Sequence, residues 1–215
     1  MPTDLPVSCH CGGLQGVAAG RSPQDGNHGV CYCDDCQLFA RFLGRADALL
    51  DAHGGTGIFQ MSAGRLRITR GRDHLACMRL TRKGLLRWYA ACCNTPVGNT
   101  LRSPAIPFLG LVLACAAPDE TSGPLDACVG PLRVRVHGRH AIDARGVGDP
   151  PLHERIPLGN FARVLARLVA WRLRGDAARS PFFDRATGEP VVRPYVLSAA
   201  ERERLRAVRR PAAGG

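Results

Sequence analysis

Lysine is almost absent from this sequence. Lys83 is the single lysine among 29 basic residues, and the others are arginines. With 18 acidic residues the formal net charge is +11, which would suit an acidic partner such as nucleic acid. The arginines are, however, spread along the chain, and with the abundant alanine and glycine they are typical of a GC-rich coding sequence. We therefore do not expect nucleic-acid binding.

The sequence also has no long hydrophobic run. The longest, residues 106–117, is interrupted by Pro107 and is too short to span a bilayer. The first eight residues, MPTDLPVS, have neither the basic region nor the apolar segment of a secretory signal. No membrane partner is expected, and the sequence predicts a soluble, cytoplasmic protein.

Cysteine, in contrast, is abundant, with ten in 215 residues. Thiols stay reduced inside cells, so closely spaced cysteines indicate metal binding or catalysis rather than disulfides. Cys77 and Cys115 lie in apolar, strand-like stretches and are expected in the core, because a free cysteine packs as a small hydrophobic side chain. Cys128 also stands alone, and its position indicates no role.

Residues 5–137 carry mostly strand signals. Glycines and small residues predict two hairpins, one joining residues 7–11 to 14–17 and one joining 58–61 to 65–69. Further strands are predicted at residues 76–80, 85–90, 108–114 and 132–136. A helix after residue 33, capped by Asp34 or Asp35, is expected to end at Gly44. The expected class is mainly β, a compact fold of short antiparallel sheets.

The pattern changes after residue 137. Residues 138–157 are rich in glycine, proline and charge, and we expect a connector there. Apolar residues then recur at helical spacing, which predicts a helix packed on the sheet through Phe161, Leu165 and Leu168. Ser198 and Glu201 form a capping box for a last helix. The predicted organisation is a zinc-binding β domain (1–137), a connector (138–157) and a helical C-terminal extension (158–215) that packs on the β domain.

Seven cysteines fall into three clusters: Cys9 with Cys11, Cys31 with Cys33 and Cys36, and Cys92 with Cys93. A structural zinc takes four protein ligands, whereas a catalytic zinc takes three and keeps one position open. The middle cluster supplies three ligands from one tight loop, and the outer clusters supply up to four together. The sequence therefore predicts two zinc ions per chain, one structural and one catalytic. The alternative is a buried cluster of reduced thiols without metal.

The segments SCHCGGLQG, CYCDDCQLF and YAACCNTPV resemble the signature segments of the glutathione-dependent formaldehyde-activating enzyme family, which also includes centromere protein V. That family's pattern is Cys-x-Cys-Gly, then Cys-x-Cys-x-x-Cys, then Cys-x-x-Cys-Gly-Thr-Pro, in a compact all-β zinc fold. The resemblance covers roughly residues 5–115, and the first two motifs are specific in order and spacing. The arginine-rich C-terminal part lies outside the pattern.

The resemblance implies that the first hairpin and the third segment hold a structural zinc through Cys9, Cys11 and Cys93. It implies that Cys31, Cys33 and Cys36 hold the catalytic zinc.

The third segment departs from the family, because its first cysteine should fall at position 90, which is Ala90. Either Cys92 replaces it and both Cys92 and Cys93 bind, which we expect, or the structural site is weakened or lost. Asn94 stands where the family has glycine, and asparagine tolerates the left-handed conformation.

Other polar residues near the clusters have alternative roles. His10 lies between two ligands and is expected to point to the opposite face of its strand, at the surface. Asp34 and Asp35 either cap the helix or serve beside the open zinc, where we assign Asp35 as the catalytic proton acceptor. His53, Arg41 and Arg45 either line a pocket or lie on a solvated face.

For function, the resemblance implies the reversible joining of formaldehyde and glutathione to give S-hydroxymethylglutathione. A three-thiolate zinc would bind the substrate thiol as a thiolate or polarise the carbonyl oxygen. We therefore expect a zinc-dependent carbon–sulfur lyase or adduct-forming enzyme acting on a small thiol and an aldehyde, with the oligomeric state left open. The alternative is a non-catalytic, zinc-stabilised binding or scaffold domain.

Overall fold

Two β-sheets form the body of the protein in a computed structural model that describes residues 3–21 and 26–208. The smaller sheet has the order β1 (Thr3–Ser8), β2 (Gln15–Arg21), β5 (Leu66–Arg70). The larger sheet has the order β10 (Val134–Val136), β3 (Asn27–Cys31), β4 (Thr56–Ser62), β9 (Phe108–Val112), β8 (Thr95–Thr100), β7 (Leu86–Ala90), β6 (Leu75–Arg79), β11 (Tyr195–Val196). The mainly β class is confirmed.

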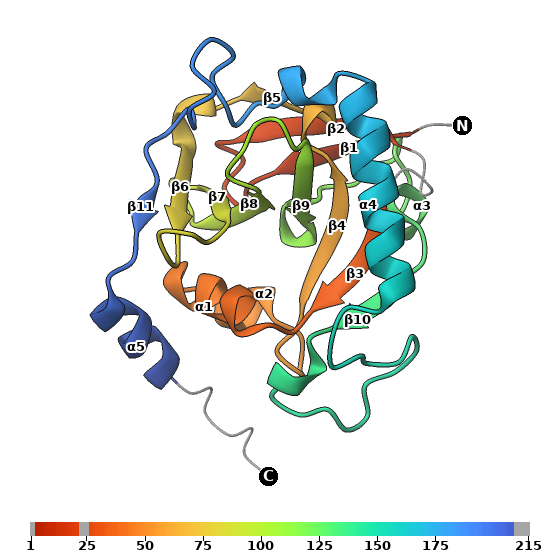
Figure 1. Cartoon of the computed structure of the whole chain (residues 1–215), viewed down its shortest axis with the longest axis vertical. Helices are drawn as coiled ribbons and strands as arrows, with labels where there is room; N and C mark the ends of the chain where they lie inside the picture. The colour runs from red at the N-terminus through yellow and green to blue at the C-terminus, as the bar shows by residue number, and fades with distance from the viewer. Residues whose placement is uncertain (1–2, 22–25, 209–215) are drawn as a thin grey trace.

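The α-helices of the described part are α1 (Asp34–Phe42), α2 (Ala46–Leu49), α3 (Leu125–Val129), α4 (Leu158–Leu173) and α5 (Ala199–Ala207). In Figure 1, α1 and α2 lie at one end of the strands, and α4 runs alongside β3 and β4. Within the described residues, no helix is both long and apolar enough to cross a membrane.

The main core lies between the two sheets. Leu5 and Val7 of β1 belong to one buried cluster with Phe59 and Trp88 of the larger sheet. The C-terminal extension also contributes to this core, because the centroid of the Phe182 ring lies 4.7 Å from the centroid of the Trp88 ring. Besides helices, this extension contains β11, which pairs in parallel with β6.

A second buried cluster packs α1 against the other face of the larger sheet. It contains Leu38 and Phe39 of α1 and Met78 of β6. The neighbouring Cys77 belongs to the main core, because successive side chains on a strand point to opposite faces. Cys77 and Cys115 are both buried, as expected for core cysteines, and Cys128 is buried as well.

The first predicted hairpin is confirmed, since β1 and β2 pair antiparallel around a turn in which Gly12 has a φ of +73°. The second is wrong. β4 pairs with β3 and β9, whereas β5 pairs with β2 in the other sheet. A 3-10 turn at Ala63–Arg65 redirects the chain between the sheets, which the residue pattern alone does not distinguish from a hairpin turn.

Asp34 and Asp35 do not cap α1, so that expectation is wrong. The N-cap residue is Cys33, without a side-chain cap, and both aspartates lie in the first turn, where negative charge suits the helix dipole. Their carboxylates instead face His140 and Arg87. The capping box of Ser198 and Glu201 at the start of α5 is confirmed.

The apolar stripe of α4 is largely exposed, which corrects the prediction that it packs on the sheet. Phe161 is 57% exposed, Leu165 is 50% exposed and Leu168 is only half-buried. The buried residues of the helix are Asn160 and Trp171. The Asn160 side chain accepts a hydrogen bond from Asn27, so this polar contact and the buried Trp171 both hold the helix against the protein.

Leu165→Asp is therefore expected to change the melting temperature by less than about 2 °C, because surface substitutions usually stay within about 0.5 kcal/mol. Trp171→Ala on the same helix removes a buried side chain and should cost about 3–5 kcal/mol. Circular dichroism during heating measures both. An equally large effect of Leu165→Asp would show that this face is covered in solution.

Candidate metal centres

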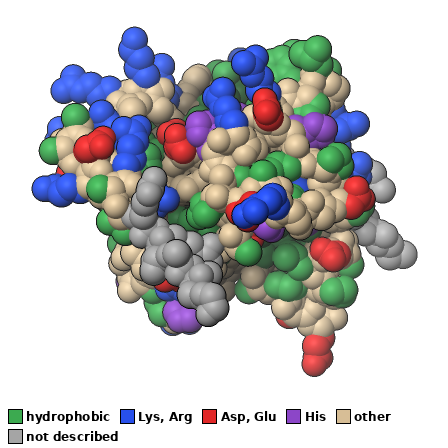
Figure 2. All heavy atoms as spheres, turned by 90° about the horizontal axis from the view of Figure 1, so that it is seen from below, with side chains coloured by type: hydrophobic (Ala, Val, Ile, Leu, Met, Phe, Trp, Pro, Cys, Tyr) green, Lys and Arg blue, Asp and Glu red, His purple; other side chains and the backbone are tan. Residues whose placement is uncertain are grey.

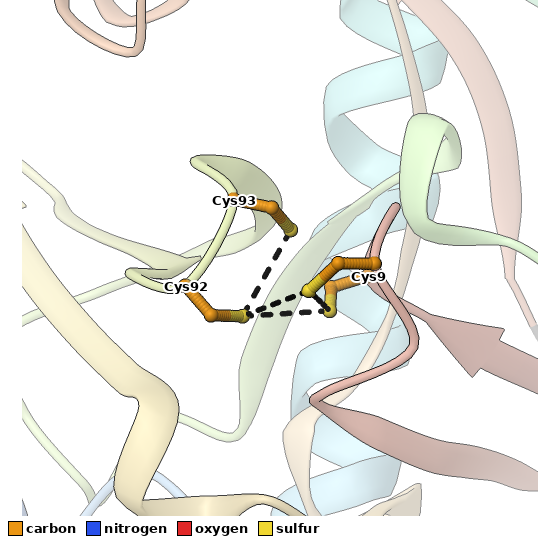
Figure 3. Close-up of side chains that lie close together, drawn as sticks. Cys9, Cys92 and Cys93 are labelled. Carbon is orange, nitrogen blue, oxygen red and sulfur yellow. Dashed lines mark hydrogen bonds between the residues drawn. The ribbon is translucent and has the colours of Figure 1, made fainter.

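Four cysteines from distant parts of the chain converge at one point. Cys9 and Cys11 lie in the turn between β1 and β2, and Cys92 and Cys93 lie in the turn between β7 and β8. Their four Sγ atoms all lie within 4.8 Å of one another. Figure 3 shows the sulfurs of Cys9, Cys92 and Cys93 pointing into the space between the two turns. The structure thus brings Cys92 and Cys93 to the same point despite the alanine at position 90.

The backbone of each turn makes this convergence possible. Asn94 has a φ of 54°, so it adopts the left-handed conformation expected from its side chain, and the chain reverses directly after Cys93. A Cβ on Gly13 would lie 3.3 Å from Cys92 Sγ and 3.4 Å from Cys11 Sγ. Gly13 therefore leaves room for the sulfurs, and the Leu14 N–H donates to Cys9 Sγ at 3.1 Å.

The sulfur spacing fits a tetrahedral metal ion. Zinc–sulfur bonds of about 2.3 Å place tetrahedral sulfurs about 3.8 Å apart. The observed separations are 3.6 Å (Cys9–Cys11), 3.7 Å (Cys9–Cys92), 3.4 Å (Cys11–Cys92) and 3.9 Å (Cys92–Cys93). Burial opposes ionisation of Cys93, but hydrogen bonds from Thr95 and the other cysteines lower its pKa to about 6. Burial and the neighbouring thiols raise the pKa of Cys92. The spacing of the four sulfurs allows this cluster to hold a metal ion.

The second cluster is local. Cys31 ends β3, Cys33 is the N-cap of α1, and Cys36 lies in the first turn of that helix. The Cys31 and Cys33 sulfurs are 3.3 Å apart, and all three sulfurs lie within 4.8 Å of one another. Within the described residues, no histidine, aspartate or glutamate joins this group. A metal bound here would keep at least one position for another ligand.

A buried arginine lies beside this cluster. Arg87 on β7 is 2% exposed, donates to Asn99 Oδ1 at 3.2 Å and lies 3.4 Å from a carboxylate oxygen of Asp35. Hydrogen bonds from Cys31 and Cys33, with the charge of Arg87, hold the pKa of the Cys36 thiol well below its usual range although burial opposes this.

Three thiolates with a divalent ion would carry a net charge of −1, which the buried guanidinium of Arg87 would offset. Arg87 was not predicted from the sequence. The available signal was a single arginine in the otherwise apolar strand LRWYA.

A cavity of about 220 Å³ opens beside the three cysteines. It lies over one face of the larger sheet, and residues from β3, β4, β9 and β10 line it together with Ile156 and Asn160 from the C-terminal part. Most of its lining is apolar. Asp35 borders the cavity, and its side chain is 56% exposed. The structure therefore places the predicted proton acceptor at the mouth of the site.

The other polar residues considered from the sequence do not line this cavity. His10 is exposed, and His53 Nδ1 lies 2.7 Å from the Asp143 carbonyl oxygen. Arg41 donates to Gln37, and Arg45 donates to the Cys93 carbonyl oxygen at 3.2 Å. Arg45 thus stabilises the turn that carries Cys92 and Cys93.

On the face of the molecule shown in Figure 2, arginine side chains gather toward the left, where α5 lies, and acidic and apolar side chains lie among them. The net positive charge does not form one continuous patch on this face.

Comparison with known proteins gives one family. A family model described as a family of unknown function (DUF6151) matches residues 1–193, which includes α4. No curated protein matches the sequence. A crystal structure of a Rhodobacter sphaeroides protein from a structural genomics programme is similar, with 19% identity and a TM-score of 0.37, over 59% of this chain and 96% of that chain.

Proposed function

The chain belongs to a family of unknown function (DUF6151), and we propose that it is a zinc-dependent enzyme that joins a small thiol to an aldehyde. The observation that carries this proposal is the three-cysteine cluster, which opens onto a largely apolar cavity beside a buried arginine. A purely structural metal site would have its fourth protein ligand in place. The motif resemblance to the formaldehyde-activating family supports the same reaction.

Zinc is the metal proposed for both clusters, because soft thiolate ligands and tetrahedral spacing favour it. When bound at the three-cysteine cluster, zinc would stabilise the substrate sulfur as a thiolate or polarise the aldehyde oxygen. Cys31, Cys33 and Cys36 would hold the ion, and Arg87 would balance the negative charge of the thiolates.

The reaction is an addition and involves no oxidation. The thiol loses its proton, its sulfur forms a bond to the carbonyl carbon, and the carbon–oxygen double bond becomes a single bond. The carbonyl oxygen then takes up a proton to give a hydroxyl group. Asp35, at the cavity mouth, would accept the thiol proton and return it to the oxygen, and its ion pair with Arg87 would hold it in position.

The four-cysteine cluster has a different role in this proposal. Its ligands come from turns that are 83 residues apart between Cys9 and Cys92. A metal at this point would connect the smaller sheet to the larger sheet and stabilise the fold.

Two zinc ions per chain are expected in protein purified without chelator, measured by inductively coupled plasma mass spectrometry. The four- and three-cysteine groups each have a spacing that could accommodate one ion. A reproducible value of one would remove one of the two assignments. A value of zero, or another metal at full occupancy, would contradict the proposal that zinc is the cofactor.

The activity itself is tested by two-dimensional NMR exchange spectroscopy. With formaldehyde and either glutathione or a smaller thiol, the zinc-loaded protein should accelerate exchange between the free thiol and its hydroxymethyl adduct. If the protein with both ions accelerates no exchange with any thiol tested, the enzyme proposal fails and a zinc-stabilised binding domain takes its place.

A further inference from the structure

Three carboxamide side chains form a connected group in the wall of the cavity. Asn27 of β3 donates through Nδ2 to Gln60 Oε1 of β4 at 2.9 Å and to Asn160 Oδ1 of α4 at 3.2 Å. Asn27 is 1% exposed and Asn160 is 8% exposed, and all three line the cavity. Residues 27 and 160 lie far apart in sequence, so α4 completes this wall.

The hydrogen bonds inside this group leave polar atoms unmatched. The oxygens of Gln60 and Asn160 both accept from Asn27, which leaves their amide nitrogens to donate into the cavity. Asn27 Oδ1 is buried and also lacks a partner. A buried polar atom without a partner is costly, so Asn27 Oδ1 needs a hydrogen-bond donor from a ligand. The amide nitrogens of the wall can donate to an acceptor on a ligand in the cavity.

The amide group lies at a defined distance from the cysteines. Asn27 and Cys31 are four residues apart on β3 and share one face, so their Cα atoms are separated by roughly 13 Å at the usual strand rise. Between these ends the sheet leaves room for a ligand, because the lining residue Gly110 of β9, which lies opposite Gln60, has no side chain. Ile58, Phe108 and Val134 provide apolar walls. The cavity therefore suits an elongated, mainly apolar ligand.

The charges in the cavity are confined to the cysteine end. Among the described lining residues, the charged or titratable side chains apart from the cysteines are Asp35, Arg87 and His137. Arg87 lies beside Cys36, and His137 follows Val136, which pairs with Cys31. The amide end offers no cation for a carboxylate and no anion for an ammonium group. A charged group there would lose its hydration without a partner of opposite charge.

We infer that this cavity binds an uncharged, elongated molecule with an amide group, whose carbonyl accepts hydrogen bonds from Gln60 and Asn160 and whose N–H donates to Asn27 Oδ1, while its other end lies at the three cysteines. The identity of that other end as a thiol rests on the proposed function, whereas the neutral carbonyl end does not. Asn160 is then a specificity-determining residue that the C-terminal extension supplies. A tripeptide thiol with two carboxylates and an ammonium group is a poorer match than a neutral amide-bearing thiol.

The probes are pantetheine, which is an uncharged thiol with two amide groups, its S-methyl thioether, and glutathione. Calorimetric titration of the zinc-loaded protein should give a dissociation constant for pantetheine at least tenfold lower than for glutathione. Asn160→Leu and Gln60→Met each remove a donor at similar size and should weaken binding of the thioether about fivefold to tenfold. Leu165→Ala, on the exposed face of the same helix, is the matched control and should bind normally.

The outcomes separate this inference from the enzyme proposal. Glutathione binding as tightly as pantetheine, or normal thioether binding by a folded Asn160→Leu or Gln60→Met protein, would overturn the inference even if thiol–aldehyde exchange is catalysed. Donor-dependent binding of the thioether would support the inference even if no exchange is found, in which case only the enzyme proposal fails. Gln60→Met carries the test alone if Asn160→Leu does not fold.

Discussion

Cys93→Ser is expected to leave the protein poorly folded at 25 °C, with the four-cysteine ion lost. Cys93 belongs to the turn after β7, and its metal would join that turn to the first hairpin across about eighty residues of sequence. Structural zinc contributes about 10–16 kcal/mol in small metal-dependent domains, which is as large as the whole stability of a typical domain. Circular dichroism, thermal unfolding and zinc content measure the effect.

Cys115→Ser is the matched control for this substitution. Cys115 is also a buried free cysteine, but its Sγ donates to the carbonyl oxygens of Val97 and Val112 rather than facing other sulfurs. A serine hydroxyl can donate to the same oxygens, so only a modest loss of stability is expected. If Cys93→Ser is as stable as Cys115→Ser and retains two ions, then Cys93 is not a ligand that stabilises the fold.

Cys36→Ser is expected to stay folded, retain about one zinc per chain and lose thiol–aldehyde exchange. Cys31, Cys33 and Cys36 lie within six residues, so closing that loop restrains little of the chain. Loss of this ion should therefore cost less stability than loss of the other, but it removes the centre that holds the substrate. Thermal unfolding, zinc content and exchange spectroscopy on the same preparation test the three parts.

Cys31→Ser is a second test of the three-cysteine cluster. It is needed because Cys36 is buried beside Arg87, so replacing Cys36 also disturbs that contact. Cys31 is only half-buried, so its replacement should give the same loss of activity with less effect on packing. If Cys36→Ser and Cys31→Ser unfold while Cys93→Ser does not, the structural and catalytic roles have been assigned to the wrong clusters.

The features predicted correctly from the sequence are mostly local. The first hairpin, the capping box at Ser198 and the left-handed Asn94 each depend on a few neighbouring residues whose backbone preferences are strong. The three-cysteine cluster is local in the same way, because one strand end and one helical turn bring its sulfurs together. The second hairpin was predicted wrongly because residues 62–64 fit a hairpin turn and a 3-10 turn equally well. The 3-10 turn that forms leads the chain into the other sheet.

The sequence by itself determined the mainly β class and the grouping of seven cysteines, because strand alternation and ligand spacing depend on residues that are close in sequence. Only the tertiary structure decided that Arg87 lies beside Cys36, that Asn160 meets Asn27, and that the apolar stripe of α4 faces outward. These contacts depend on strand order and on the orientation of a helix against the sheet. They join residues up to 133 positions apart, and such pairings are set by packing between elements rather than by the preferences of either partner.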